Sequence, residues 1–146
     1  MQKLFNPKSV ALIGATDRAG SVGLGIAKNL LAGAKQRKIF FVNPNSKKVL
    51  KQKTFASILD IKEKVDLAII AVPSKFVKQV SQECCSAEAG SVIIISSGFA
   101  ETGQVGEILQ KEIALLFDQN KIPLVGPNCL GVINPTVKLN ASFSPD

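Results

Sequence analysis

The sequence predicts an α/β fold in which a mostly parallel β-sheet carries helices on both of its faces. Short apolar runs without polar alternation are typical of strands that are covered on both sides. Stretches with apolar residues at helical spacing separate these runs, and strand and helix alternate about five times along the chain. Glycine, proline, serine or asparagine follows each predicted strand, at the edge where open parallel sheets bind ligands. Together these observations indicate a Rossmann-like architecture.

The first half of the sequence predicts two buried strands, an amphipathic helix, a short edge strand and a brief helix. The buried strands are apolar runs that end at Gly14 and at the turn residues 43–45. Val22, Ile26 and Leu30 keep the spacing of one helix face. In chain order, the expected elements are residues 10–13, 22–34, 39–42, 51–54 and 57–61, the last capped by Ser57.

The second half continues the alternation with three strands and two helices. Pro73 ends the first apolar run, and Ser74 is a suitable N-cap for the helix that follows. Val105, Ile108 and Ile113 place an apolar face on the next helix. The expected elements are residues 67–72, 74–84, 92–95, 105–116 and 123–125.

The length indicates one domain followed by a short tail. A chain of 146 residues has the size of a single domain with one core, and residues 1–133 hold all of the elements predicted above. Residues 134–146 differ in character, because Asn134-Pro135 interrupts the alternation. We expect this tail to lead into a further domain that the sequence lacks.

The amino-acid composition excludes several kinds of catalytic and metal site. The sequence has no histidine, which excludes a histidine general base, a phosphohistidine and an imidazole metal ligand within these residues. No metal site is predicted, because the three cysteines show no Cys-x-x-Cys spacing, and we expect reduced, mostly buried thiols. The net charge is +7, and no aromatic residues alternate with the lysines, so a nucleic-acid site is not indicated. We expect most of the basic residues to lie on a solvated face and some of them to be directed at phosphates.

We predict a cytoplasmic location. The longest strongly apolar run, residues 67–72, is far shorter than the roughly 20 residues that cross a bilayer. The N-terminus reaches Lys3 and Pro7 before any apolar run develops, so no signal peptide is expected.

A glycine-rich loop, residues 14–23, joins the first strand to the first helix and is the leading candidate for a ligand site. Small residues let backbone amides approach a phosphate, and the following helix N-terminus favours an anion. The spacing departs from the dinucleotide fingerprint, Asn43 stands where that fingerprint expects a carboxylate, and the Walker lysine pattern is absent. A phosphate-bearing, nucleotide-like ligand is expected; the alternative is a turn that only packs helix against strand. The candidate contacts in this loop are Gly14, Thr16, Gly20, Ser21, Val22 and Gly23.

Three later strand ends have both a structural and a binding interpretation. The loop at residues 71–74 either stops a strand or lines the ligand crevice. The loop at residues 96–103 contains Phe99, which a simple turn does not require, so we expect a ligand contact there. The loop at residues 126–131 is either a tight turn or the rim of the site, where Asn128 offers amide donors and an acceptor.

An ordered set of segments carries a family resemblance: residues 4–7, 14–23, 41–44, 66–73, 97–103 and 126–135. Together they resemble the N-terminal CoA-binding domain of ADP-forming (NDP-forming) acyl-CoA synthetases, which are related to the succinyl-CoA synthetase alpha subunit. The resemblance covers nearly the whole chain and implies that residues 20–23 hold CoA phosphates. It further implies contacts along the pantetheine and nucleotide from Val72, Pro73, Ser97, Gly98, Phe99, Ala100 and Glu101. Asn45 stands where the family usually has a lysine that meets a CoA phosphate.

The resemblance implies a role within an ATP-dependent, ADP-forming acyl-CoA (acetyl-CoA) synthetase, an acid–CoA ligase. This chain would present the CoA thiol to an acyl phosphate formed on other domains, with Asn43 facing the nucleotide end and Asn128 guiding the pantetheine arm. By itself it would not be catalytic, and ATP or ADP would bind only to missing domains or a subunit of ATP-grasp type. The expected partners are CoA and those domains, with a homo-oligomer left open and no nucleic acid or membrane.

Two other interpretations remain at this point. One is a non-catalytic CoA-binding regulatory module of a protein acetyltransferase, or a stand-alone CoA-binding protein. The other is an NAD-dependent oxidoreductase domain, against which the neutral Asn43 argues.

Overall fold

The structure, a computed structural model, describes residues 1–145. Its strands are β1 (Ser9–Ile13), β2 (Lys38–Val42), β3 (Lys48–Val49), β4 (Gln52–Phe55), β5 (Leu67–Ile70), β6 (Val92–Ile94), β7 (Leu124–Val125), β8 (Gly131–Asn134) and β9 (Leu139–Ser142). Its α-helices are α1 (Gln2–Phe5), α2 (Val22–Ala32), α3 (Ser74–Ser86) and α4 (Gln104–Gln119). Short 3₁₀ helices are η1 (Ala34–Gln36), η2 (Ile58–Asp60), η3 (Ala100–Thr102) and η4 (Pro135–Val137). Within this described part, no helix combines the length and apolarity needed to span a bilayer.

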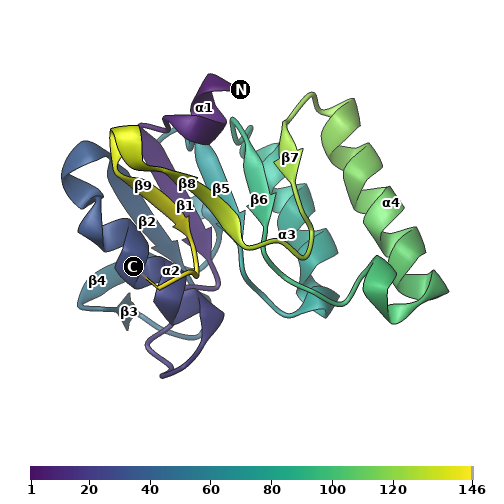
Figure 1. Cartoon of the computed structure of the whole chain (residues 1–146), viewed down its shortest axis with the longest axis horizontal. Coiled ribbons are helices and arrows are strands. Elements are labelled where there is room, and N and C mark those ends of the chain that lie inside the picture. Colours follow the sequence, from purple (N-terminus) through teal and green to yellow (C-terminus); the bar gives the residue numbers. More distant parts are fainter. Residues whose placement is uncertain (146) are drawn as a thin grey trace.

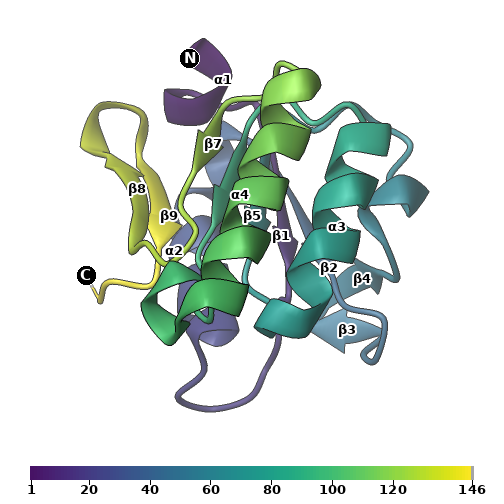
Figure 2. The same ribbon diagram turned by 90° about the vertical axis from the view of Figure 1, so that its right-hand side faces the viewer.

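Strands β1 to β7 form one sheet in the order β3-β4-β2-β1-β5-β6-β7, and all neighbours except β3 and β4 run parallel. Helix α2 and the β8–β9 hairpin lie on one face of the sheet, and α3 and α4 lie on the other (Figures 1 and 2). The predicted Rossmann-like α/β class is confirmed. Because β1 pairs with both β2 and β5, the strand order reverses beside the end of β1.

Each face of the sheet has its own apolar core. Every residue of β1 and β5 is buried, which explains why these runs show no polar alternation. Successive strand residues point to opposite faces, so Leu12 packs with Leu30 of α2. Ile13 belongs to the other cluster, with Val77 of α3 and Phe117 of α4.

Local capping sets the helix ends. Helix α2 begins after Ser21, whose hydroxyl accepts a backbone N–H from the first turn at 3.2 Å, and it stops at Gly33, earlier than expected. The short η2 begins after Ser57, which caps it as expected, and Asp60 completes a capping box. The prediction that Ser74 caps α3 is wrong, because Pro73 occupies the N-cap position and Ser74 is the first helical residue.

The apolar face expected on α4 is rotated at its start. Val105 and Ile108 are 83% and 54% exposed, whereas Gly106 and Phe117 are buried. A Cβ atom at Gly106 would lie 2.0 Å from the carbonyl oxygen of Phe99 in the preceding loop. This backbone contact turns Gly106 inward, and Val105 and Ile108 therefore face solvent.

Residues 134–142 belong to this domain, which corrects the expected boundary between domain and tail. Strands β8 and β9 form an antiparallel hairpin, and β9 packs against α2 with Leu139 and Ala141 fully buried. Asn29 of α2 donates hydrogen bonds to two backbone carbonyls at the end of the hairpin, at 2.8 and 2.9 Å. Pro135 interrupts the sequence pattern because the chain there turns through η4 between the two hairpin strands.

A buried guanidinium fastens the same hairpin to the amino edge of the sheet. Arg37 is only 7% exposed and donates to the carbonyl oxygens of Val137 and Lys138 at 2.5 and 2.9 Å. Longer contacts of 3.4 Å reach the carbonyls of Pro7 and Gly33. Burial lowers the pKa of Arg37. Its donors are directed at backbone acceptors, which offset the cost of burying the charge.

We expect Leu139→Ala to destabilise the domain by about 2–5 kcal/mol, because it removes a buried side chain from the core under the hairpin. Urea unfolding followed by circular dichroism measures the change. Leu130→Ala is the matched control, since Leu130 is 49% exposed and its truncation should change stability by no more than about 0.5 kcal/mol. Equal effects of the two substitutions would contradict the assignment of the tail to this domain.

Candidate functional site

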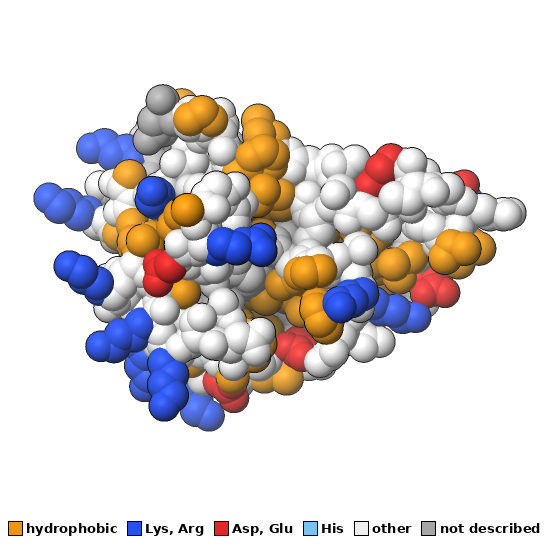
Figure 3. Space-filling view, turned by 90° about the horizontal axis from the view of Figure 1, so that it is seen from below, with side chains coloured by type: hydrophobic (Ala, Val, Ile, Leu, Met, Phe, Trp, Pro, Cys, Tyr) orange, Lys and Arg blue, Asp and Glu red, His pale blue; other side chains and the backbone are white. Residues whose placement is uncertain are grey.

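A cleft of about 1180 Å³ opens at the carboxyl edge of the sheet, where the loops after the parallel strands meet the N-termini of α2 and α3. Figure 3 shows this face of the molecule. The structure brings most of the predicted site residues to the walls of this cleft. They are Gly14, Thr16, Ser21, Val22, Gly23, Asn43, Asn45, Val72, Pro73, Ser97 and Asn128.

The remaining predicted residues do not line the cleft: Gly20, Gly98, Phe99, Ala100 and Glu101. Phe99 is fully buried in the core on the α3–α4 side of the sheet. Its presence in the loop is thus explained by packing, and the expected side-chain contact with a ligand does not agree with this position. Gly20 lies on the exposed part of the glycine loop, and a Cβ atom there would have no atom within 4 Å.

Close backbone packing explains two of the loop glycines. A Cβ atom at Gly23 would lie 2.2 Å from the carbonyl oxygen of Gly14, and one at Gly14 would lie 2.2 Å from that of Ala71. Gly14 also has a φ of 100°, a conformation that disfavours other residues. The end of β1, the start of α2 and the end of β5 therefore meet backbone to backbone at the cleft.

Free amide donors result from this arrangement. Ser21 caps α2 through its hydroxyl, which also donates to the carbonyl of Arg18 at 2.7 Å. Among residues 1–145, the N–H groups of Val22 and Gly23 have no acceptor, as expected for the first residues of a helix. Helix α3 also begins at the cleft, and Pro73 provides it with no side-chain cap. Such helix N-termini favour the binding of a phosphate.

Most polar side chains at the cleft hold its loops in place. The amide of Asn43 donates to the carbonyl of Ala15 at 2.8 Å, and its oxygen accepts from the N–H of Asn45 at 2.8 Å. The hydroxyl of Thr16 accepts from the N–H of Arg18 at 3.2 Å. By contrast, the side-chain amide of Asn128 has no hydrogen-bond partner within the described residues and remains available to a ligand.

Glu101 closes its own loop rather than the cleft. Its carboxylate accepts a hydrogen bond from the N–H of Gly98. Hydrogen bonds from the backbone N–H groups of Gly98, Glu101 and Phe99 lower the pKa of this exposed carboxyl group. The amides of this loop are thus already paired with an anion of the chain itself.

The thiols of this chain are free and poorly ionised. Cys129 lies at the cleft, where its Sγ donates to the carbonyl of Ile94 at 3.3 Å, and burial raises its pKa. Burial also raises the pKa values of Cys84 and Cys85. None of them has the thiolate character that a cysteine nucleophile requires.

Two parts of the cleft wall were not predicted from the sequence. Leu130 and Phe143, which are 49% and 39% exposed, form an apolar mouth with Val22 at one end. Phe143 was assigned to the tail, so only the hairpin's position reveals its role.

On the other side, a stripe of α3 faces the cleft, and it includes Phe76 and Glu83. Phe76 and Glu83 are seven residues apart, which is about two helical turns, and this spacing could have predicted that they share one helix face.

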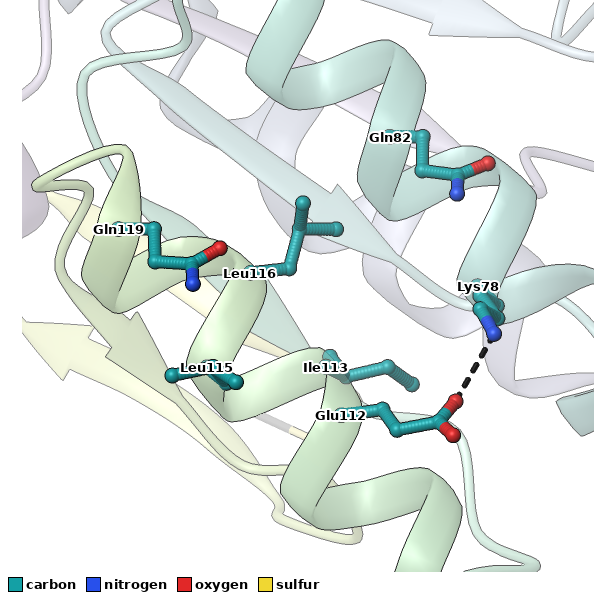
Figure 4. A pocket seen from close by; sticks show the side chains of 7 residues that line it. All are labelled: Lys78, Gln82, Glu112, Ile113, Leu115, Leu116 and Gln119. Atoms are coloured by element: carbon teal, nitrogen blue, oxygen red, sulfur yellow. Dashed lines mark hydrogen bonds and ion pairs between the residues drawn. The ribbon is translucent and has the colours of Figure 1, made fainter.

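A second, smaller hollow of about 240 Å³ lies between α3 and α4 (Figure 4). Leu115, Leu116 and Ile113 line it, and an ion pair of 2.8 Å between Lys78 and Glu112 closes one side. It contains no part of the glycine loop or of a helix N-terminus and therefore has none of the features that bind phosphate.

Comparison with known proteins assigns a family. A family described as "CoA binding domain" matches residues 8–135. The ADP-forming acetate–CoA ligase I of Archaeoglobus fulgidus is 42% identical over 146 residues, which cover 99% of this chain and 21% of that protein. Subunit alpha of the ADP-forming acetate–CoA ligase I of Pyrococcus furiosus is 40% identical, over 99% of this chain and 32% of the subunit.

A solved structure agrees with these relatives. The dinucleotide forming acetyl-coenzyme A synthetase 1 of Ca. Korarchaeum cryptofilum, in complex with phosphate and ADP, has a TM-score of 0.92 and 33% sequence identity to this chain. The match covers 99% of this chain and 31% of that one. The chain thus spans only between 21% and 32% of the length of these relatives.

We expect Gly23→Ala to destabilise the domain by about 1–3 kcal/mol, because its methyl group would force Gly14 and α2 apart. Thermal unfolding measures the loss. Gly25→Ala in the same helix is the control, since its Cβ would lie 3.7 Å from the nearest atom and should stabilise α2 by up to about 1 kcal/mol. A Gly23→Ala variant as stable as the wild type would show that the backbone contact is not tight.

Proposed function

The chain belongs to the CoA-binding domain family, and we propose that its cleft binds coenzyme A on behalf of an ADP-forming acid–CoA ligase. The observation that carries the proposal is the pair of unpaired N–H groups of Val22 and Gly23, which start α2 in the wall of the large cleft. Unpaired backbone amides at a helix N-terminus suit the pyrophosphate of CoA. The proposed contacts are the predicted residues that line the cleft, whereas Phe99 is a core residue and Glu101 is paired within its own loop.

The charge of the cleft supports the same ligand. Arg18 lines the cleft, and its guanidinium has no acceptor among the described residues. It can therefore neutralise a phosphate near the α2 N-terminus. Lys47 and Lys48 are exposed near Asn45, where they can replace the lysine that the family usually has at that position.

In the proposed role, this domain presents the thiol of CoA to an acyl phosphate. The sulfur would bond to the acyl carbon and lose its proton, the carbon–oxygen bond to phosphate would break, and phosphate would leave with that proton. This sequence holds no histidine, so a phosphohistidine that makes the acyl phosphate must reside on other parts of the enzyme. Those parts, which would also bind ATP or ADP, are the proposed partners, and the cytoplasm is the proposed location.

The ligase role is preferred over the other two interpretations. The relatives reported above are ADP-forming ligases rather than acetyltransferases. An NAD site lacks its usual ribose carboxylate, because Asn43 occupies that position and its amide is engaged with Ala15 and Asn45.

Isothermal titration of the chain with CoA, NAD and ATP tests the proposal. We expect saturable binding of CoA at one site per chain and no comparable heat with NAD or ATP. A crystal soaked in CoA should show the pyrophosphate at the N-terminus of α2. Binding of NAD in preference to CoA, or CoA bound outside the cleft, would contradict the proposal.

We expect Arg18→Ala to weaken CoA binding about tenfold, because a charge-assisted hydrogen bond to phosphate is lost. The loss should shrink as salt is raised, since an exposed charge is screened. Lys35→Ala removes an equal charge from η1, outside the cleft, and should leave the affinity unchanged. Equal losses in both variants would indicate that only the net charge of the domain matters.

A further inference from the structure

One carboxylate lines a cleft that otherwise suits an anion. Glu83 lies on α3 in line with Phe76, Gln79 and Val80, all of which face the cleft at helical spacing. Ala56, in the loop after β4, lines the cleft as well. From Ser74 at the start of α3 to Glu83, the helix rises about 13 Å. The cleft therefore extends along α3, well away from the amides at the start of α2.

The carboxylate of Glu83 is held in a fixed position by neutral donors. The hydroxyl of Ser57 donates to Oε2 at 2.7 Å, and the side-chain amide of Gln79 donates to Oε1 at 3.2 Å. No ion pair of the described residues includes Glu83, and the other charged side chain that lines the cleft is Arg18. Each carboxylate oxygen can accept a further hydrogen bond, and the group has no donor of its own.

A phosphate beside this carboxylate would be repelled, so this end of the cleft suits a neutral group that carries hydrogen-bond donors. The surrounding residues restrict the group further, because the side chains of Phe76, Val80, Ala56 and Pro44 are apolar. A flat heterocycle with an exocyclic amino group fits both conditions.

The surrounding charge indicates which end of CoA lies here. Lysines and arginines gather on the β3–β4 side of the face shown in Figure 3, and the exposed Lys47 and Lys48 precede β4 on that side. The ribose phosphate of CoA is attached next to the base, so this basic side suits the nucleoside. The apolar mouth around Leu130 and Phe143 remains for the pantetheine arm and its thiol.

We propose that Glu83, positioned by Ser57 and Gln79, accepts a hydrogen bond from the amino group of adenine and selects for that base. This inference rests on the proposed binding of CoA and adds a specificity-determining residue to it. Glu83 also joins α3 to the cap of η2 through Ser57, which is a structural contact. The test must therefore separate base recognition from stability.

The experiment compares CoA with its purine analogue, in which a hydrogen atom replaces the amino group. Titration calorimetry of the wild-type chain should show about tenfold tighter binding of CoA, because the carboxylate meets no donor in the analogue. In Glu83→Gln the acceptor is neutral and its hydrogen bond to the amino group is weaker, so the ratio of the two affinities should fall toward one. Glu88→Gln makes the same change on a residue outside the cleft and should keep the wild-type ratio.

The outcomes separate this inference from the proposed function. Equal affinities of the wild-type chain for the two ligands would overturn the role of Glu83 while leaving CoA binding intact. A Glu83→Gln variant that keeps the wild-type ratio would overturn it too, whatever its melting temperature. Absence of CoA binding by the wild-type chain would overturn both.

Discussion

The structure depends on the close approach of three backbone segments at the end of β1. Gly14 touches the carbonyl of Ala71, and Gly23 touches the carbonyl of Gly14, so neither position has room for a Cβ atom. This packing sets the start of α2 directly against the sheet at the point where strand order reverses. The cleft, its free amides and the direction of the helix dipole all follow from that contact.

Most polar side chains around the cleft hold backbone segments in position, and in the proposed complex backbone N–H groups contact the ligand. Ser21 and Asn43 each use their polar atoms on the backbone of the glycine loop. A rigid set of amides loses little entropy on binding, which suits a ligand that is recognised chiefly by its phosphates. Arg18 and Glu83 are the charged groups at the walls of the cleft, and in the proposed CoA complex they distinguish one end of the ligand from the other.

The C-terminal hairpin completes the domain. Arg37 and Asn29 attach it through backbone carbonyls, and Leu139 fills the core above α2. Its last residues bring Phe143 to the mouth of the cleft. In the proposed ligase, this mouth is where the thiol would leave the domain toward the parts that make the acyl phosphate.

The sequence by itself determined the α/β class, the glycine loop and the order of the parallel strands and of helices α2, α3 and α4, because these follow from local periodicity and turn chemistry. Only the tertiary structure decided that Phe99 is a core residue, that Val105 faces solvent and that Phe143 joins the cleft. Each of these depends on contacts between segments far apart in the chain. Periodicity within one segment shows that a face is apolar or polar, but the neighbour that covers that face is set by packing across the whole fold.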